Sequence, residues 1–160
     1  VGHAHPALVK AISEQAAKLM HCSNIYYTDI QAKAVKEIIE TTGFDRVFLA
    51  NSGAEANEGA IKLARKYGHQ KNEGKYRIIT AVHSFHGRTM MTVTATGQPK
   101  YQQGYEPLPA GFDYVPYGDL EALREAMDED VCCVLLEPFR GKAAFMFPVI
   151  HTCVGKIIVR

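Results

Sequence analysis

The stretch ANSGAEANEGAIKLARK, residues 50–66, indicates the fold most clearly, because an apolar run there passes directly into a helical pattern. Ser52 and Glu55 have the spacing of a capping box. In such a box the Ser52 hydroxyl accepts a hydrogen bond from the Glu55 amide, and the Glu55 carboxylate accepts one from the Ser52 amide. We therefore expect a helix over residues 54–67, with these side chains on one face: Ala56, Ala60, Leu63, Ala64 and Tyr67.

Gly53, in the first turn of this helix, allows two interpretations. A helix cap alone explains Ser52 and Glu55 but requires no glycine between them. A glycine would also let a ligand approach the free N–H groups at the helix start, whose partial positive charge favours an anion such as phosphate. The common nucleotide loops G-x-G-x-x-G and G-x-x-x-x-G-K-[ST] are absent. The residues alone leave the cap and the anion site open.

The rest of the chain alternates between helical and extended patterns. This alternation predicts an α/β fold with right-handed crossovers and a mainly parallel sheet. Residues 84–97 are ambiguous, because their Thr and Val content favours a strand whereas Gly97 resembles a helix stop. The other segments are predicted as helices over 6–20, 29–40 and 120–129, the last capped by Asp119, extended segments over 46–50, 76–82, 113–118 and 131–137, and a loop over 98–112.

The composition is that of an ordinary soluble domain. The 160 residues are 47% hydrophobic, which is sufficient for one core. The 18 basic and 17 acidic residues nearly balance, so charge gives no reason to expect nucleic acid or an anionic membrane as a partner. No apolar run approaches a membrane span, and no signal peptide is visible. We expect a cytoplasmic protein with four reduced cysteines: Cys22, Cys132, Cys133 and Cys153.

A second polar cluster, HSFHGR at residues 83–88, follows the predicted strand 76–82. It is either a simple connecting loop with a core phenylalanine or a binding loop. In a binding loop Phe85 would lie flat on a planar ligand and Arg88 would hold a carboxylate. We expect no metal site, because two histidine pairs lack the cysteine or acidic residues that would complete one: His83 with His86, and His3 with His5.

Several sequence motifs follow one another in a fixed order along residues 1–138. They are GHAHP (2–6), NSGAEANEGAIKLARK (51–66), SFHGRT (84–89), ATGQPKY (95–101) and VLLEP (134–138). Together they resemble the class III pyridoxal-phosphate-dependent aminotransferases of fold type I. The resemblance implies a partial large domain with flanking helices, and pyridoxal 5'-phosphate as the cofactor. Residues 101–123 resemble the branch that moves the amino group of N-acetylornithine to 2-oxoglutarate in arginine biosynthesis; ornithine, succinylornithine and 4-aminobutyrate remain alternative donors.

The resemblance also implies roles for individual residues. Gly53 and Ala54 would bind the cofactor phosphate through their amides, and Ser52 would add its hydroxyl. Phe85 would stack on the pyridine ring, and Arg88 would contact the substrate carboxylate. The expected cofactor-binding set is therefore Ser52, Gly53, Ala54, Phe85, His86 and Glu137.

The family lysine that forms a Schiff base with the cofactor belongs to a downstream segment, so no catalytic residue is assigned here. We expect residues 1–160 alone to have no transaminase activity. The purified chain should then lack the absorbance of a lysine-bound cofactor. The alternative function is a non-catalytic α/β fragment that binds an anion or a partner chain. Family members are homodimers with sites at the subunit interface, and SNIYYTD at residues 23–29 resembles interface sequence.

The resemblance stops at Pro138, after which the family continues with IQGEGG. Reading the codons of residues 139–160 one base earlier permits the string IQGEGGVHVPGNPY, the family continuation. We therefore expect a family domain over 1–138 and a frameshifted tail over 139–160, in preference to a natural divergent tail. Resequencing the gene around the Pro138 codon tests this hypothesis.

Overall fold

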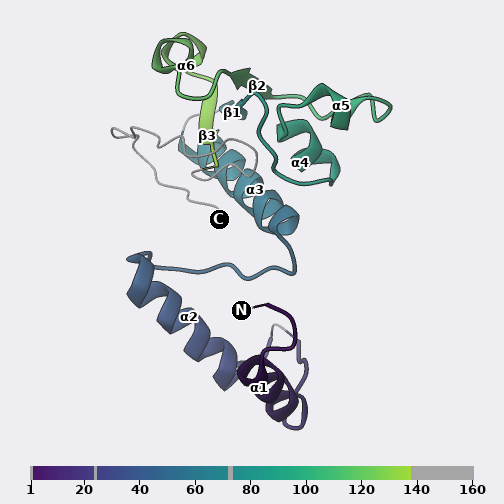
Figure 1. The fold of residues 1–160 in the computed structure, drawn as a ribbon. Helices are drawn as coiled ribbons and strands as arrows, with labels where there is room; N and C mark the ends of the chain where they lie inside the picture. The colour runs from purple at the N-terminus through teal and green to yellow at the C-terminus, as the bar shows by residue number, and fades with distance from the viewer. Residues whose placement is uncertain (1, 24, 72–73, 138–160) are drawn as a thin grey trace. The chain divides into compact units, whose positions relative to one another are not determined.

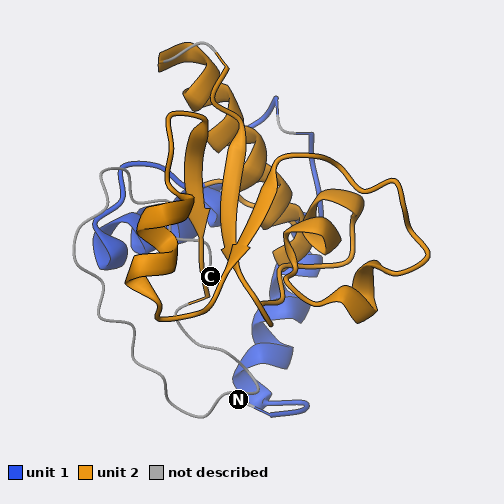
Figure 2. Ribbon diagram, turned by 90° about the horizontal axis from the view of Figure 1, so that it is seen from above, with its two compact units in different colours: residues 1–47 blue, residues 48–160 orange. Residues whose placement is uncertain are grey.

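The computed structural model describes residues 2–23, 25–71 and 74–137. The boundary expected at Pro138 and the tail over 139–160 lie outside these residues. The chain divides into two compact units, residues 1–47 and 48–160 (Figure 2).

The first unit contains two helices, α1 (Pro6–Ala16) and α2 (Asp29–Thr42). Both were expected, although α1 ends four residues before the predicted limit. His5 is the N-cap of α1, and its Nδ1 accepts a hydrogen bond of 3.3 Å from the Ala7 amide. Thr28 caps α2, and Gly43 ends it with a left-handed φ of 72°. Local capping therefore accounts for both helices.

The apolar faces of α1 and α2 remain open. Neither helix buries a residue within the described part of the chain. Leu8 is 47% exposed, Ile12 58% and Ile30 49%. The helical spacing of these residues thus predicted the two helices correctly. Within the described residues of the first unit, no element buries the apolar faces of these helices.

The second unit is built on a parallel sheet in the order β2-β1-β3. Its strands are β1 (Arg77–Ala81), β2 (Phe112–Val115) and β3 (Val131–Leu135). The central strand β1 pairs Ile79 with Asp113 of β2 and with Val134 of β3. The predicted α/β class and parallel sheet are confirmed. Because the strands are parallel, their carboxyl ends meet at one edge of the sheet.

Helices cover both faces of this sheet (Figure 1). On one face, α3 (Gly53–Lys71) and α4 (Met90–Ala95) form a core that joins Ile61, Ile78, Ala95 and Leu135. On the other face, α6 (Leu120–Ala126) packs Ala122, Leu123 and Ala126 against Ile79, Val115 and Val131. Asp119 caps α6 as predicted, since its carboxylate accepts hydrogen bonds from the Glu121 and Ala122 amides.

The buried face of α3 differs from the predicted one. Ile61, Ala64 and Gly68 are buried, whereas Leu63 and Tyr67 are 60% and 58% exposed. Gly68 explains the difference, because a Cβ there would lie 2.7 Å from the Cys132 Cβ. The helix packs on the sheet through Ile61 and the small residues Ala64 and Gly68. Of the predicted face, Ala64 is therefore buried, Ala56 and Ala60 are partly buried, and the two larger residues lie outside the contact.

Residues 46–50 do not form the predicted strand. No described strand pairs with this segment, and Phe48 is 72% exposed and Leu49 45%. Apolar residues alone do not make a strand, because the ladder of backbone hydrogen bonds needs a neighbour. The prediction was therefore wrong for the described residues.

The ambiguous segment 84–97 contains helix α4 rather than a strand. Thr89 and Thr92 form a reciprocal capping box at its start. At its end, the Gln102 side chain donates to the carbonyls of Thr94 and Thr96 at 3.1 and 2.8 Å. Gln102 belongs to a short helix, α5 (Pro99–Gln102), within the predicted loop. Side-chain capping at both ends therefore outweighs the strand propensity of Thr and Val.

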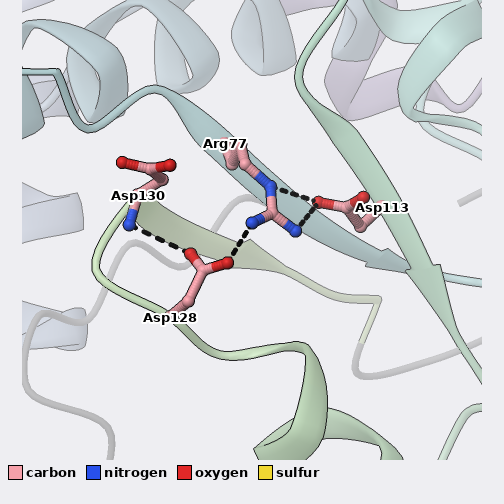
Figure 3. Close-up of polar contacts among 4 residues, drawn as sticks. All are labelled: Arg77, Asp113, Asp128 and Asp130. Carbon is pink, nitrogen blue, oxygen red and sulfur yellow. Dashed lines mark hydrogen bonds and ion pairs between the residues drawn. The ribbon is translucent and has the colours of Figure 1, made fainter.

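Arg77 ties together the amino ends of the strands (Figure 3). Its Nη2 lies 2.7 Å from Asp113 Oδ2 of β2, and its Nη1 pairs with Asp128, just before β3. These hydrogen bonds, to Asp113 and then Asp128, raise the pKa of Arg77. Desolvation opposes ionisation of Asp128, but hydrogen bonds from Asp130 and Arg77 lower its pKa overall. The ionic cluster therefore lies at the end of the sheet opposite to the carboxyl ends of the strands.

Cys22, Cys132 and Cys133 are free thiols, and Cys153 lies outside the described residues. Burial raises the pKa of Cys133 to about 12, with the neighbouring Cys132 contributing. Burial also raises the pKa of Cys132. Because the thiolate is the reactive form, we expect iodoacetamide at pH 8 to alkylate Cys22 before Cys132 and Cys133. Timed quenching with fragment-resolved mass spectrometry measures the order.

Unfolding the chain in urea provides the control, because the three sites should then react at similar rates. Alkylation of Cys133 as fast as Cys22 in the folded chain would contradict the expected protection.

Candidate functional site

Helix α3 begins at Gly53, directly after Ser52. The Ser52 hydroxyl accepts a hydrogen bond from the Glu55 amide at 3.2 Å, as predicted. The reciprocal bond differs from the prediction, because Glu55 Oε2 accepts from the Asn51 amide at 2.7 Å rather than from the Ser52 amide. The carboxylate thus reaches one residue further upstream and fixes the chain that enters the helix.

The space around Gly53 is open. A Cβ at Gly53 would meet nothing within 4 Å, and its φ is not positive, so neither packing nor backbone conformation requires glycine. The Gly53 and Ala54 amides lie at the helix start, where no intrahelical acceptor reaches them. Within the described residues, neither amide donates a hydrogen bond to a protein acceptor. The turn 52–54 is therefore an open cradle of donors that an anion fits.

The second cluster follows the carboxyl end of β1 and folds back on α3. His83 occupies the turn with a φ of 62°. The His86 amide donates to Thr96 Oγ1 at 2.9 Å, and the Asn57 side chain donates to the His86 carbonyl at 2.6 Å. His86 itself is only 4% exposed. Its backbone therefore joins the loop to both α3 and the segment after α4, while its side chain lies inside the unit.

Gly87 brings the two clusters into contact. Its φ is 139°, and a Cβ there would lie 2.8 Å from the Ala54 Cβ and 2.6 Å from Thr92 Oγ1. One residue beyond Arg88, the Thr89 hydroxyl donates a hydrogen bond to the Glu58 carboxylate on α3. The turn 52–54 and the loop 83–88 are thus adjacent, although they are some thirty residues apart in the sequence.

Phe85 and Glu137 meet beyond the ends of β1 and β3. The Phe85 amide donates to Glu137 Oε2 at 3.0 Å, and the Tyr117 hydroxyl donates to the Glu137 carbonyl at 3.1 Å. The Phe85 ring is 44% exposed. It contacts Tyr101 edge to face, with centroids 5.9 Å apart and planes at 77°. The loop is therefore fixed through its backbone, while the aromatic ring remains accessible.

Arg88 is exposed and lines a surface pocket of about 440 Å³. Its guanidinium carbon lies 5.8 Å from the centroid of the Tyr101 ring. Lys100 and Tyr105 line the same pocket. This arrangement places a cation beside aromatic surface, which suits a carboxylate-bearing ligand. We call this cavity the Arg88–Lys100 pocket.

The structure therefore gathers Ser52, Gly53, Ala54, His86 and Arg88 around one contact, and joins Phe85 to Glu137. Their roles toward a ligand remain predictions. Analysis of the sequence did not identify the residues that hold these loops, because side chain-to-backbone bonds between distant residues leave no local pattern. The residues missed are Asn57, Glu58, Thr96, Lys100 and Tyr101. All five nonetheless lie inside motifs quoted from the sequence, the first two in residues 51–66 and the other three in residues 95–101.

Two negative findings concern the described residues alone. In those ranges, no group of three or more His, Cys, Asp or Glu residues is arranged so that it could hold a metal ion. Among the helices in the same ranges, none has the length and apolar character needed to cross a membrane.

Comparison with known proteins relates this geometry to a family. Residues 1–152 match the model of the family "Aminotransferase class-III". The acetylornithine aminotransferase of Caldanaerobacter subterraneus subsp. tengcongensis is 57% identical over 143 residues, which cover 89% of this chain and 36% of that protein. A succinylornithine transaminase/acetylornithine aminotransferase of Pseudomonas aeruginosa is 49% identical over 147 residues, which cover 91% of this chain and 36% of that protein.

A solved structure shows the same similarity in three dimensions. The ornithine aminotransferase of Toxoplasma gondii, described with partial occupancy of PLP at its active site, superposes with a TM-score of 0.85 at 31% identity. The match covers 92% of this chain and 36% of that one. The chain thus spans little more than a third of the length of these relatives. With the family model matched over residues 1–152, the chain belongs to the class III aminotransferases.

Proposed function

We propose that this chain supplies the phosphate-binding and ring-facing part of an aminotransferase that uses pyridoxal 5'-phosphate. The observation that carries the proposal is the contact between Ala54 and Gly87, which joins an open helix start to an exposed aromatic and a guanidinium. Class III membership and the PLP at the active site of the Toxoplasma gondii relative support the choice of cofactor. When bound, this cofactor would supply the electron sink for amino-group transfer.

The residues of the cradle fit the phosphate of such a cofactor. The amides of Gly53 and Ala54 would donate to phosphate oxygens, and the dipole of the 19-residue helix α3 would favour the negative charge. The Ser52 hydroxyl already accepts from the Glu55 amide and would donate its proton to the phosphate. The protein therefore provides donors at this turn without a lysine or arginine.

The remaining site residues would orient the cofactor ring and the substrate. Phe85 would cover one face of the ring, because its loop is fixed by the bond to Glu137 while its side chain is exposed. Arg88 would hold a substrate carboxylate at the edge of the pocket. His86, being buried, would support this loop from behind rather than contact the substrate.

We propose N-acetylornithine as the amino donor and 2-oxoglutarate as the acceptor. The relatives named for acetylornithine support this choice, at 57% and 49% identity. The second of them is also named for succinylornithine, so an N-succinylated donor is the alternative within the same chemistry.

Replacing Gly53 by alanine separates ligand binding from stability. We expect Gly53→Ala to leave the chain as stable as the wild type or up to about 0.5 kcal/mol more stable, because the new methyl group meets no protein atom. The methyl group would obstruct the approach of phosphate, so affinity for pyridoxine 5'-phosphate should fall about tenfold. This probe lacks the aldehyde that reacts with surface lysines. Titration calorimetry and thermal melting measure the two effects.

Lys66→Ala, on the same helix and exposed, is the control and should change neither affinity nor phosphate dependence. Pyridoxine without phosphate should bind wild type and Gly53→Ala equally. Undiminished binding of the phosphorylated probe to Gly53→Ala would contradict the proposed cradle.

A further inference from the structure

Two cations of the second unit share one aromatic ring. Arg88 lies 5.8 Å and Lys100 4.7 Å from the centroid of the Tyr101 ring. Each contact is a weak attraction between a cation and the π-electrons of the ring. Both cations therefore contact one ring, and both line the same pocket.

The Arg88–Lys100 pocket has no carboxylate among its lining residues. Two carboxylates hydrogen-bond to residues in or next to this lining. Glu58 accepts the hydrogen bond of the Thr89 hydroxyl, and Glu106 accepts one from the Gly104 amide at 2.8 Å. Among the described residues, neither carboxylate forms an ion pair with Arg88 or Lys100. The pocket therefore carries a local positive charge that an anionic ligand would balance.

We infer that this pocket binds a dicarboxylate and that Lys100 is its second cationic contact beside Arg88. The inference deepens the proposed function, on which it rests for the expectation that Arg88 binds a substrate carboxylate. Lys100 would then favour a dicarboxylate acceptor over a monocarboxylate one. It would be a residue that determines substrate specificity, since it acts on the second carboxylate.

The apolar part of the pocket supports a ligand with a short aliphatic chain. Met90 and Val93 lie in the wall together with the rings of Tyr101 and Tyr105. A chain of a few methylene groups between two carboxylates would contact this wall while its ends face the cations. A monocarboxylate of the same length would leave one cation unbalanced.

The backbone that carries Lys100 is held in place. Lys100 belongs to α5, whose Gln102 side chain donates to the carbonyls of Val93, Thr94 and Thr96 and to the Tyr114 hydroxyl. The Tyr101 ring also packs against the Phe85 ring in a T-shaped arrangement. The pocket walls are therefore positioned before a ligand arrives, which reduces the entropy lost on binding.

Glutarate, an unreactive five-carbon dicarboxylate, tests the inference with the full 160-residue chain and no cofactor. Binding is followed by ligand-observed NMR, with butyrate as the monocarboxylate comparison. We expect Lys100→Gln to weaken glutarate binding about fivefold and to leave butyrate binding nearly unchanged. Lys100→Arg should retain the affinity for glutarate within about twofold, because it keeps the charge.

Lys66→Gln removes a positive charge from an exposed site outside the pocket and should leave the affinity for glutarate unchanged. Melting curves show that each variant is folded. The inference is overturned if wild type does not bind glutarate, if Lys100→Gln binds it as wild type does, or if Lys66→Gln weakens it equally. Glutarate binding without binding of pyridoxine 5'-phosphate would support this pocket and reject the proposed cofactor cradle, so the two failures are distinguishable.

Discussion

Gly97→Ala is expected to destabilise the second unit by about 3–5 kcal/mol, a large part of the stability of an ordinary domain. A Cβ at Gly97 would lie 2.4 Å from the Ala81 carbonyl oxygen and 2.9 Å from the Val82 Cα. These atoms belong to the end of the central strand and the residue after it, so they cannot rotate away as a side chain would. Gly97 also accepts a hydrogen bond from the His83 amide at 2.6 Å. The added methyl group would therefore separate two backbone segments that are bonded to each other.

Urea denaturation followed by circular dichroism measures this loss. Gly104→Ala is the matched control, because a Cβ there meets nothing within 4 Å and only its φ of 88° is unfavourable. The control should lose about 1 kcal/mol. Equal denaturation midpoints for the two variants would show that the close approach at Gly97 is not required.

Gly87→Ala is expected to cost about 3 kcal/mol and to abolish most binding of pyridoxine 5'-phosphate. Its φ of 139° is strained for alanine, and the new methyl group would overlap Ala54 and Thr92. Because Ala54 is part of the cradle, the loop and the helix start would have to separate. Stability and ligand binding should therefore fall together, in contrast to the opposite responses expected for Gly53→Ala.

A double-mutant cycle shows whether this contact is the cause. Ala54→Gly removes one of the two overlapping groups, so it should recover about 1 kcal/mol of the stability lost in Gly87→Ala. Gly118→Ala, which has a φ of 84° and open space, controls for backbone strain alone. Additive effects of Ala54→Gly and Gly87→Ala would mean that the two loops do not depend on each other through this contact.

The sequence predicted the elements whose signals are local. Ser52 and Glu55 marked the start of α3, Asp119 marked α6, and the apolar runs that became β1 and β3 were bounded by polar residues. Caps and short apolar runs act within a few residues, so their patterns remain visible in the chain. These elements were enough to predict the parallel α/β class correctly.

The errors arose where contacts between distant segments decide the structure. Residues 46–50 resemble a buried strand, but a strand exists only where a neighbour pairs with it. The buried face of α3 depends on Gly68 meeting Cys132, two residues far apart in the chain. The short helix α4 depends on Gln102, a residue outside it. None of these partners can be identified from periodicity.

The candidate site was more predictable than its supports. The loop 83–88 follows the carboxyl end of β1, as its sequence predicted. The segment before the turn 52–54 is not a strand, so strand ends alone could not predict that the turn and the loop are adjacent. Asn57, which donates to the His86 carbonyl, looks like any polar residue on an exposed turn of helix.

The ionic cluster around Arg77 lies at the amino ends of the three strands, whereas the loop 83–88, which contacts the turn 52–54, follows the carboxyl end of β1. A protein engineer could therefore modify them separately. Substitutions around Asp113 and Asp128 would adjust thermal tolerance while the turn 52–54 and the loop 83–88 keep their geometry. Changes in the loops could in turn be screened for altered substrate preference against a scaffold whose strands are anchored elsewhere.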